Sequence, residues 1–237
     1  MPPEPPPPSR RRELLAGCRD ELPILLGVVP FGMIYGVLAL DAGFSPAAAQ
    51  SMSSIVFAGS AQLVTAQLWR EAAPGAVVVL TVFVVNLRHA LYSASLAPYL
   101  RHLGPAWKGI LAYLLTDEAY AVAVTRYLRD GDRPDASPFR HWYFLGAGLT
   151  LWLSWQASTA AGVFLGGVVP AGWSLEFTLP LTFIALVFPA LRDRGAIAAA
   201  LSAGILAVLV LGLPYKLGLV VAALAGILVG LLVEAHG

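Results

Sequence analysis

A long apolar run, Gly75–Leu96, carries an amide, a guanidinium and an imidazole in its interior. These groups lie in the segment Asn86-Leu87-Arg88-His89-Ala90-Leu91-Tyr92. About 20 apolar residues in a helix are enough to cross the roughly 30 Å hydrocarbon core of a bilayer. A charge at that depth costs on the order of 2.5–3.5 kcal/mol on insertion scales. The run therefore predicts a membrane helix whose polar side chains face a cavity or a partner.

The composition is that of an integral membrane protein. Hydrophobic residues make up 58% of the chain and charged residues 12%, whereas soluble domains carry roughly 25% charged residues. The apolar residues form long blocks, and a helix satisfies its own backbone hydrogen bonds in lipid, so we expect an all-α, polytopic membrane helix bundle. The net charge of +1 gives no indication of a nucleic-acid partner. Cys18 is the only cysteine, which excludes an internal disulfide, and we expect neither a metal site nor a cofactor.

The apolar blocks predict about eight membrane spans, with seven as the alternative, some of them broken or kinked by proline. The second span is dense in serine and glycine, so a continuous and a re-entrant path both stay open for it. Prolines in the first and sixth spans free backbone carbonyls, which interrupted transporter helices use to hold ions or substrate. The predicted spans are Leu22–Leu40, Ser45–Trp69, Gly75–Leu96, Pro105–Tyr127, His141–Val168, Leu175–Leu191, Gly195–Leu211 and Tyr215–Val233.

The distribution of basic residues predicts the orientation of these spans. Residues 1–20, rich in proline and arginine, predict a disordered cytoplasmic tail, and residues 21–237 a single transmembrane transporter domain. Cytoplasmic loops carry an excess of Lys and Arg, which favours eight crossings with both termini in the cytoplasm. That side then receives Arg10, Arg11, Arg12, Arg19, Arg70, Arg126, Arg129, Arg133, Arg140, Arg192 and Arg194. The opposite side receives Arg101, Lys108 and Lys216.

A second polar segment lies at a similar depth in the next predicted span. Thr116, Asp117 and Glu118 interrupt the apolar run Pro105–Tyr127. Their carboxylates are candidate partners for Arg88, and opposite charges on consecutive membrane helices indicate a transport pathway. A permanent ion pair and direct contact of Arg88 with a substrate are equally open, and the two can alternate during a cycle.

Four polar motifs follow one another along the chain. They are Phe57-Ala58-Gly59-Ser60-Ala61-Gln62, Asn86-Leu87-Arg88-His89-Ala90-Leu91-Tyr92, Thr116-Asp117-Glu118-Ala119-Tyr120, and Pro180-Leu181-Thr182-Phe183 followed by Arg192-Asp193-Arg194. In this order they resemble the motifs of the AzlC family, the large subunits of bacterial branched-chain amino acid exporters. The resemblance covers residues 21–230 and implies an inner-membrane exporter of leucine, isoleucine and valine, with methionine as a further candidate. It also implies a small membrane subunit of the AzlD type as partner.

The polar residues of the third span suit such a cargo. A branched-chain amino acid is a zwitterion with an apolar tail, and Arg88 offers its carboxylate a forked partner. His89 and Tyr92 lie three apart on a helix, and Asn86 lies three before His89, so all of them border one face. His89 titrates near neutral pH and is a candidate proton carrier. Its alternative role is a neutral hydrogen bond between helices.

Asp117 and Glu118 are neighbours, so they point about 100° apart on a helix and cannot both face one site. One carboxyl is then the expected proton carrier and the other the partner of Arg88. Because Tyr113 and Tyr120 flank Asp117 at helical spacing, we predict that Asp117 faces the site and carries the proton. Glu118 is the reserve candidate.

The motif in the second span adds further candidate binding groups. Gly59 permits a break, Ser60 and Gln62 offer hydrogen bonds, and a broken helix end presents partial positive charge to a carboxylate. The alternative is a polar contact between helices. The four histidines are scattered, and no HExxH, GxSxG or cysteine pair occurs, so we do not expect an enzyme. A passive channel for polar solutes is the alternative function, because a polar midplane also suits a pore.

Overall fold

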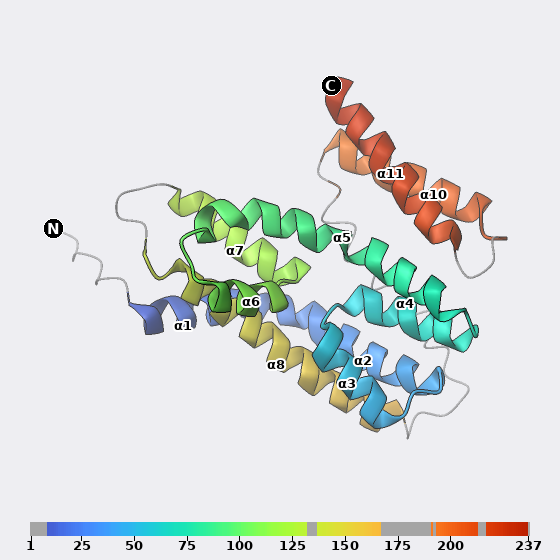
Figure 1. The fold of residues 1–237 in the computed structure, drawn as a ribbon, viewed down its shortest axis with the longest axis horizontal. Coiled ribbons are helices and arrows are strands. Elements are labelled where there is room, and N and C mark those ends of the chain that lie inside the picture. Colours follow the sequence, from blue (N-terminus) through green and yellow to red (C-terminus); the bar gives the residue numbers. More distant parts are fainter. Residues whose placement is uncertain (1–8, 132–136, 167–190, 192, 213–216, 237) are drawn as a thin grey trace.

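The computed structural model describes residues 9–131, 137–166, 191, 193–212 and 217–236, and the regular structure of these residues is helical throughout. This confirms the all-α prediction. The predicted span Leu175–Leu191 lies almost entirely outside the described residues. Figure 1 shows the helices α1 (Arg10–Glu21), η1 (Leu22–Ile24), α2 (Leu25–Asp41), α3 (Pro46–Val56), α4 (Gly59–Arg70), α5 (Gly75–Leu100), α6 (Pro105–Tyr113), α7 (Asp117–Asp130), α8 (Arg140–Gly166), α10 (Arg194–Leu209) and α11 (Leu217–His236).

The first three elements form one long, nearly uninterrupted helical stretch. The Ser9 side chain caps α1 by accepting a hydrogen bond from the Arg12 backbone N–H, and α1 passes through the short turn η1 into α2. Helix α1 thus occupies most of the segment for which the sequence predicts disorder. Its order comes from packing on α8, because the backbone at Gly17 lies so close to the Tyr143 carbonyl oxygen that a Cβ would clash with it. The sequence does not reveal this partner.

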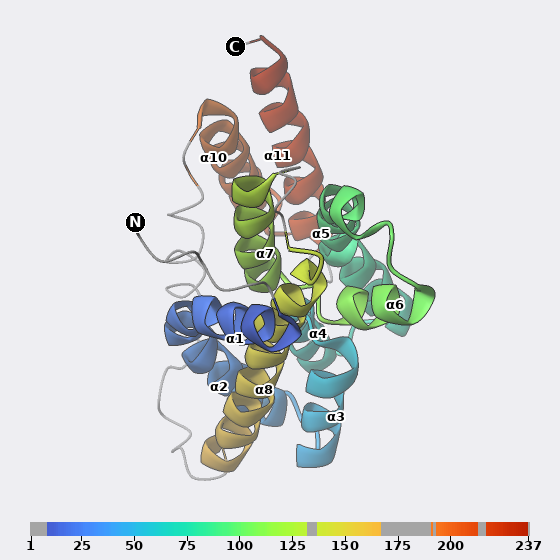
Figure 2. The same cartoon turned by 90° about the vertical axis from the view of Figure 1, so that its left-hand side faces the viewer.

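The stretch α1–α2 runs parallel to α8 along a seam of glycines. Gly17 meets Tyr143 near the start of both elements, Gly36 meets Thr159 further along, and Gly166 meets Val37 and Leu40 near their ends. Without a Cβ, glycine lets the two backbones touch, which is how membrane helices commonly pack. Since residue numbers increase in the same direction along both helical elements, α1–α2 and α8 cross the molecule in the same direction (Figures 1 and 2).

The second predicted span is a hairpin of two half-helices, α3 and α4, which returns to the end from which it starts. The break falls at Phe57 and Ala58. Arg70, the last residue of α4, forms a 3.0 Å ion pair with Asp41, the last residue of α2. This contact brings the end of α4 back beside the end of α2, so the re-entrant alternative holds for this span.

The fourth predicted span is a second hairpin, α6 and α7, inserted from the other end of the molecule. Its break runs from Leu114 to Thr116. Near the end of α7 the Tyr127 ring lies 5.3 Å, centroid to centroid, from the ring of Tyr99, close to the end of α5. Helix α5 crosses between the two hairpins, and their breaks face each other near the middle of the molecule (Figure 1).

The two hairpins correct the predicted distribution of basic residues. Arg70 lies at the far end with Asp41, and its predicted place beside the N-terminus is wrong. Lys108 donates to the Arg101 carbonyl oxygen, and the ring of His102, next to Arg101, lies 6.4 Å from that of His141 at the start of α8. Arg101 and Lys108 therefore lie at the N-terminal end, opposite to their prediction. The second and fourth predicted spans both return to the end from which they start, so the number of crossings before α8 falls by two. Because that number is even, α8 crosses the molecule in the expected direction.

Helices α10 and α11 form a separate hairpin at one side of α5 (Figure 1). A Cβ at Gly226 would meet Ala203, and one at Gly230 would meet Ala199, so the small-residue face of α11 packs on α10. By length and composition, three helices of the described residues could cross a membrane: Arg10–Asp41, Gly75–Leu100 and Leu217–Ala235.

Candidate functional site

Arg88 of α5 joins the tips of the two hairpins. One terminal nitrogen, Nη1, lies 2.5 Å from Asp117 Oδ2 at the start of α7. The other, Nη2, donates to Ser60 Oγ in the first turn of α4 over 3.1 Å. The side chains of Arg88 and Asp117 are 30% and 37% exposed, so the ion pair borders accessible space. Of the two predicted carboxylate partners of Arg88, Asp117 and Glu118, the structure pairs it with Asp117.

The first turns of both half-helices α4 and α7 lie at Arg88. A helix N-terminus carries partial positive charge because its first backbone N–H groups lack helical acceptors. Ala58, which precedes α4, has no side-chain cap to offer those groups. Thr116 caps α7 by accepting from the Ala119 backbone N–H, and two acidic residues stand in the first turn. The N-terminus of α4 therefore attracts an anion, whereas the N-terminus of α7 already carries two acidic residues.

The break before α4 is held in an unusual backbone conformation. Phe57 has φ 39° and ψ 48°, in the left-handed region that a bulky residue adopts only when its surroundings enforce it. Its ring is 4% exposed and packs against Tyr113, at the end of α6, with 6.0 Å between the centroids. The Tyr113 hydroxyl donates to the Ser54 carbonyl oxygen and accepts from Trp152 Nε1. The tips of the two hairpins are thus tied directly to each other.

The remaining predicted residues of α5 line one side of the ion pair. Tyr92 stacks on Tyr120 of α7 with ring centroids 4.4 Å apart, and Tyr120 donates to Ser95 Oγ. His89 Nδ1 lies 3.2 Å from the Asn86 carbonyl oxygen, a contact within its own helix. An edge-to-face contact joins the His89 and Tyr92 rings. This aromatic wall borders the Arg88–Asp117 pair.

Several buried polar atoms at the site have no hydrogen-bond partner among the described residues. They are Asn86 Oδ1, Arg88 Nε and Asp117 Oδ1. Buried polar groups are normally paired, and each exception calls for an explanation. A donor and two acceptors around one ion pair are the complement that a zwitterionic ligand requires.

Two predicted residues of α4 face the scaffold. Gln62 is fully buried, and its Oε1 accepts from Trp155 Nε1 of α8 over 3.1 Å. A Cβ at Gly59 would lie 2.8 Å from the Trp155 ring, so glycine allows α4 to begin against that ring. Ser54 likewise bonds Gln156 of α8. For Gln62 and Ser54 the structure has the polar helix contact that sequence reasoning kept as the alternative.

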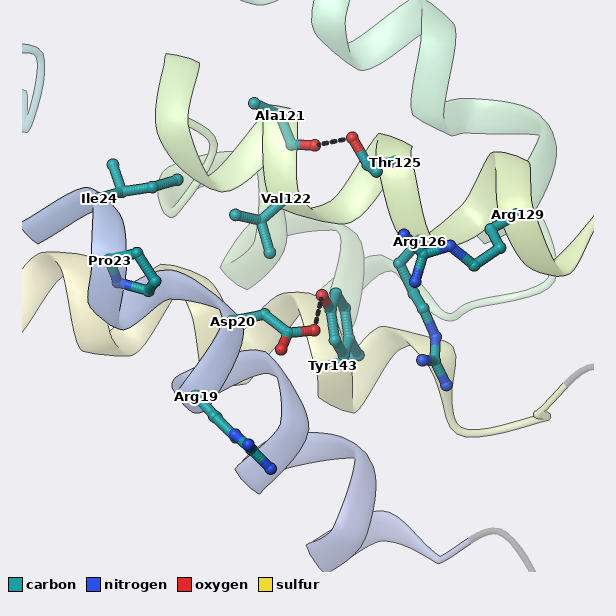
Figure 3. Close-up of a pocket in the computed structure, with 10 residues that line it drawn as sticks. All are labelled: Arg19, Asp20, Pro23, Ile24, Ala121, Val122, Thr125, Arg126, Arg129 and Tyr143. Carbon is teal, nitrogen blue, oxygen red and sulfur yellow. Dashed lines mark hydrogen bonds between the residues drawn. The ribbon is translucent and has the colours of Figure 1, made fainter. Parts of the chain in front are cut away.

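Sequence reasoning missed Glu21, the last residue of α1. Its side chain is fully buried, and neither carboxyl oxygen has a hydrogen-bond partner within the described part of the chain. Immediately before an apolar run, a glutamate resembles an interfacial residue that reaches water, so the pattern carried no signal of burial. Beside Glu21 a cavity of about 570 Å³ opens between α1, α7 and α8, with Asp20, Arg126 and Tyr143 in its wall (Figure 3).

Two half-helix hairpins that meet at a partly exposed ion pair, on a scaffold of long apolar helices, define the class of this protein. It is a helical integral membrane protein of the kind that transports solutes. The model of the AzlC protein family matches residues 23–169. The chain therefore belongs to the AzlC family.

Individual relatives agree with this assignment. The chain is 29% identical to the inner membrane protein YgaZ of Escherichia coli, over 97% of this chain and 93% of the relative. It is 32% identical to an uncharacterized membrane protein of Archaeoglobus fulgidus, over 86% and 88%. The branched-chain amino acid transport protein AzlC of Bacillus subtilis is 27% identical, over 70% of this chain and 63% of that protein. No solved structure matches the chain significantly.

Proposed function

We propose that this chain is the large subunit of a secondary transporter that exports leucine, isoleucine and valine, with methionine as a further substrate. The observation that carries the proposal is the ion pair of Arg88 and Asp117 between two opposed helix tips. The name of the Bacillus subtilis relative supports the substrate class. Proton coupling would supply the driving force for export.

Substrate would bind by exchanging partners with this ion pair. The carboxylate of the amino acid takes the guanidinium of Arg88 in a forked geometry and accepts from Ser60 and the uncapped start of α4. Its ammonium group then takes the carboxylate of Asp117, which Arg88 has released. The aromatic wall of Tyr92 and Tyr120 is the apolar surface closest to the pair. In this scheme the permanent pair and direct substrate contact are two stages of one cycle.

Opposed hairpins also suit alternating access. In transporters built from inverted elements, the parts rock around a site at the midplane that discontinuous helices form. Here the tips touch through Phe57 and Tyr113, and a shift of either hairpin would open the site to one end. A passive channel, the alternative, needs no such paired closure.

We place the chain in the bacterial cytoplasmic membrane with both termini in the cytoplasm. Arg10, Arg101 and Arg140 gather at one end with the start of α1, and basic residues favour the cytoplasmic side. At the other terminus a Cβ on Gly195 would lie 2.7 Å from Glu234, so the C-terminal end of α11 lies beside the start of α10, where Arg194 is the first residue.

A small AzlD-type membrane subunit would complete the transporter. The support is the family resemblance, together with a face of α5 whose Val79, Phe83 and Leu91 side chains are mostly exposed. We expect the purified single chain to transport little and the two subunits together to transport fully. Full transport by the single chain would remove the partner from the mechanism.

The test of the site is counterflow of labelled leucine in vesicles that hold this chain and its partner. We expect Arg88→Ala to lower counterflow at least about tenfold, since breaking a partly buried charge pair costs more than the roughly 1 kcal/mol of an exposed pair. Arg88→Lys should rescue poorly, because lysine lacks the planar fork. Arg70→Ala is the matched control, an ion-paired arginine outside the site. Normal counterflow by a well-inserted Arg88→Ala variant would overturn the proposal.

A further inference from the structure

The buried carboxyl group of Glu21 has no role in the substrate site described above. It lies at the junction of α1 and η1, fully enclosed, and both of its oxygens lack a hydrogen-bond partner within the described residues. A lone carboxylate removed from water without donors is strongly unfavourable. The group must therefore be neutralised by a proton or by a bound cation.

A second carboxyl group faces the same junction. Glu21 lies within electrostatic range of Glu118 in the first turn of α7. Val122, one turn after Glu118 on the same face of α7, lies in the cavity wall with Ile24 (Figure 3). Glu118 is adjacent to Asp117 and points about 100° away from it. One turn of α7 thus presents Asp117 to Arg88 and Glu118 to Glu21.

The surroundings of this carboxyl pair leave it without a strong counter-charge. On α8, the Tyr143 hydroxyl donates to Asp20, the neighbour of Glu21, and the guanidinium of Arg126 from α7 lies 5.5 Å above the Tyr143 ring. Arg126 itself forms an ion pair with Asp130 at 3.0 Å. Arg88, whose charge reaches Glu118, is likewise paired, with Asp117. Arg126 and Arg88 thus each already have a carboxylate partner. Two carboxyl groups in one junction removed from water favour a state in which one of them carries a proton, because ionising both is unfavourable.

The adjacent cavity offers a route for that proton. The cavity is bordered by Asp20 and Pro23, on either side of Glu21 in sequence, and by Arg19 and Arg129 at its outer part (Figure 3). Its wall changes from charged residues at the basic end to apolar ones toward the middle of the molecule. Water in the cavity would therefore approach Glu21 from the basic end.

We propose that Glu21 and Glu118 form a carboxyl pair that binds the coupling proton and exchanges it with water in this cavity. Only the coupling of this proton to transport rests on the proposed function. The proton site itself follows from the burial of Glu21. Binding forms one O–H bond on a carboxyl oxygen and neutralises one negative charge, and release returns the proton to water in the cavity. Asp117 then remains the partner of Arg88 and of the substrate, which changes the role that the sequence predicted for it.

Difference infrared spectroscopy of the complete transporter tests the proton without any substrate. At neutral pH, wild type minus Glu21→Gln should show the C=O stretch of a protonated carboxyl group in a dry environment. Glu118→Gln should shift that band, because the two groups share one proton. Glu13→Gln is the matched control, another buried glutamate on α1, and should leave the band unchanged. No such band in wild type, or a band insensitive to both variants, would overturn the proposal.

Transport in the same vesicles tests the coupling. Glu21→Gln should lose accumulation of leucine driven by a pH gradient and keep counterflow, whereas Glu13→Gln should keep both. Unchanged accumulation by Glu21→Gln would overturn the coupling role. Stabilisation of the wild type by sodium ions that disappears in Glu21→Gln would replace the proton with a metal cation. Absence of leucine counterflow in wild type would count against the proposed function alone, since the infrared band does not depend on substrate.

Discussion

The hairpins α3–α4 and α6–α7 have the same outline and opposite chemistry at their tips. Both consist of two half-helices, and both reach Arg88 with the first turn of their second half. The start of α4 has no side-chain cap and no acidic residue in its first turn. The start of α7 has a threonine cap and two carboxyl groups. One tip is suited to an anion and the other to cations and protons.

Under the proposed function, this difference would divide the substrate between the two hairpins. A zwitterion placed between them would find its carboxylate partner on one side and its ammonium partner on the other, with Arg88 able to bind either the substrate or Asp117. Since the hairpins enter from opposite ends, each half of the substrate would be held by the element that closes one end. Binding and gating would then be properties of the same two tips.

The largest effect that we expect concerns the side of the membrane on which each hairpin ends. In a Cys18→Ser background, Arg101→Cys should react with an impermeant thiol reagent from the same side as Arg10→Cys. Arg70→Cys should react only from the opposite side. The reason is that Arg70 returns to the end of α2, while Arg101 lies at the end of α5 near the start of α8.

Labelling of intact cells and of inverted vesicles measures this directly. Eight through-going crossings make the reverse prediction for both positions, because they place Arg70 with the N-terminus and Arg101 across the membrane. That result would show that the hairpins are continuous spans and would remove the comparison between their tips.

A smaller effect concerns the packing of both hairpin tips on α8. Helix α8 presents Trp155 beneath Gly59 of the first tip and Gly148 beneath Leu114 of the second. A Cβ at either glycine would come within 2.8 Å of its neighbour. We expect Gly59→Ala and Gly148→Ala each to cost about 1–3 kcal/mol of stability through overpacking.

The midpoint of thermal unfolding in detergent measures the effect of these two substitutions. Gly27→Ala is the control, since a Cβ there would have no atom within 4 Å. An unchanged midpoint for Gly148→Ala alone would mean that the second tip rests less firmly on α8 than the first.

The smallest effect separates binding from capping at the two tips. Ser60 Oγ accepts a hydrogen bond from Arg88, whereas Thr116 Oγ1 accepts from the Ala119 backbone N–H and so caps α7. Thr116→Ala should cost about 0.5–2 kcal/mol of stability, as lost caps do, and change the apparent substrate affinity little. Ser60→Ala should lower the apparent affinity with little loss of stability. Counterflow at varied leucine concentration, beside thermal unfolding, measures both, and identical behaviour of the two variants would contradict the division.

Sequence reasoning identified the charged residues at the centre of this fold, but it did not establish the course of the chain through the two hairpins. Arg88 was predicted to pair with Asp117 or Glu118 because each is a charge inside an apolar run, and burial of a charge demands compensation. For the second span, serine and glycine left a break open, whereas the break at Leu114–Thr116 contains neither proline nor glycine, so local chemistry did not mark it. A hairpin of two half-helices has the same length and hydropathy as one crossing, and only Asp41 beside Arg70 reveals the return.

Other features escaped because they depend on distant contacts. The helical state of Arg10–Glu21 and the burial of Glu21 follow from α8, which lies far along the chain. The roles of Gln62 and of the α11 glycines follow from the particular helix each one faces. Residue type and spacing indicate that such groups need a neighbour without indicating which neighbour they have.

The parallel glycine seam also sets an order for the biogenesis of the chain. Gly36 contacts Thr159 and Gly162, about 125 residues later, and at roughly 5–20 residues per second a ribosome needs about 6–25 s to reach them. During that interval α2 sits in the membrane with its glycine face unmatched and Glu21 without the enclosure that α8 provides. A nascent chain that ends before Arg140 therefore lacks every contact of this seam, and α2 can pack only on α3 and α4 until α8 arrives.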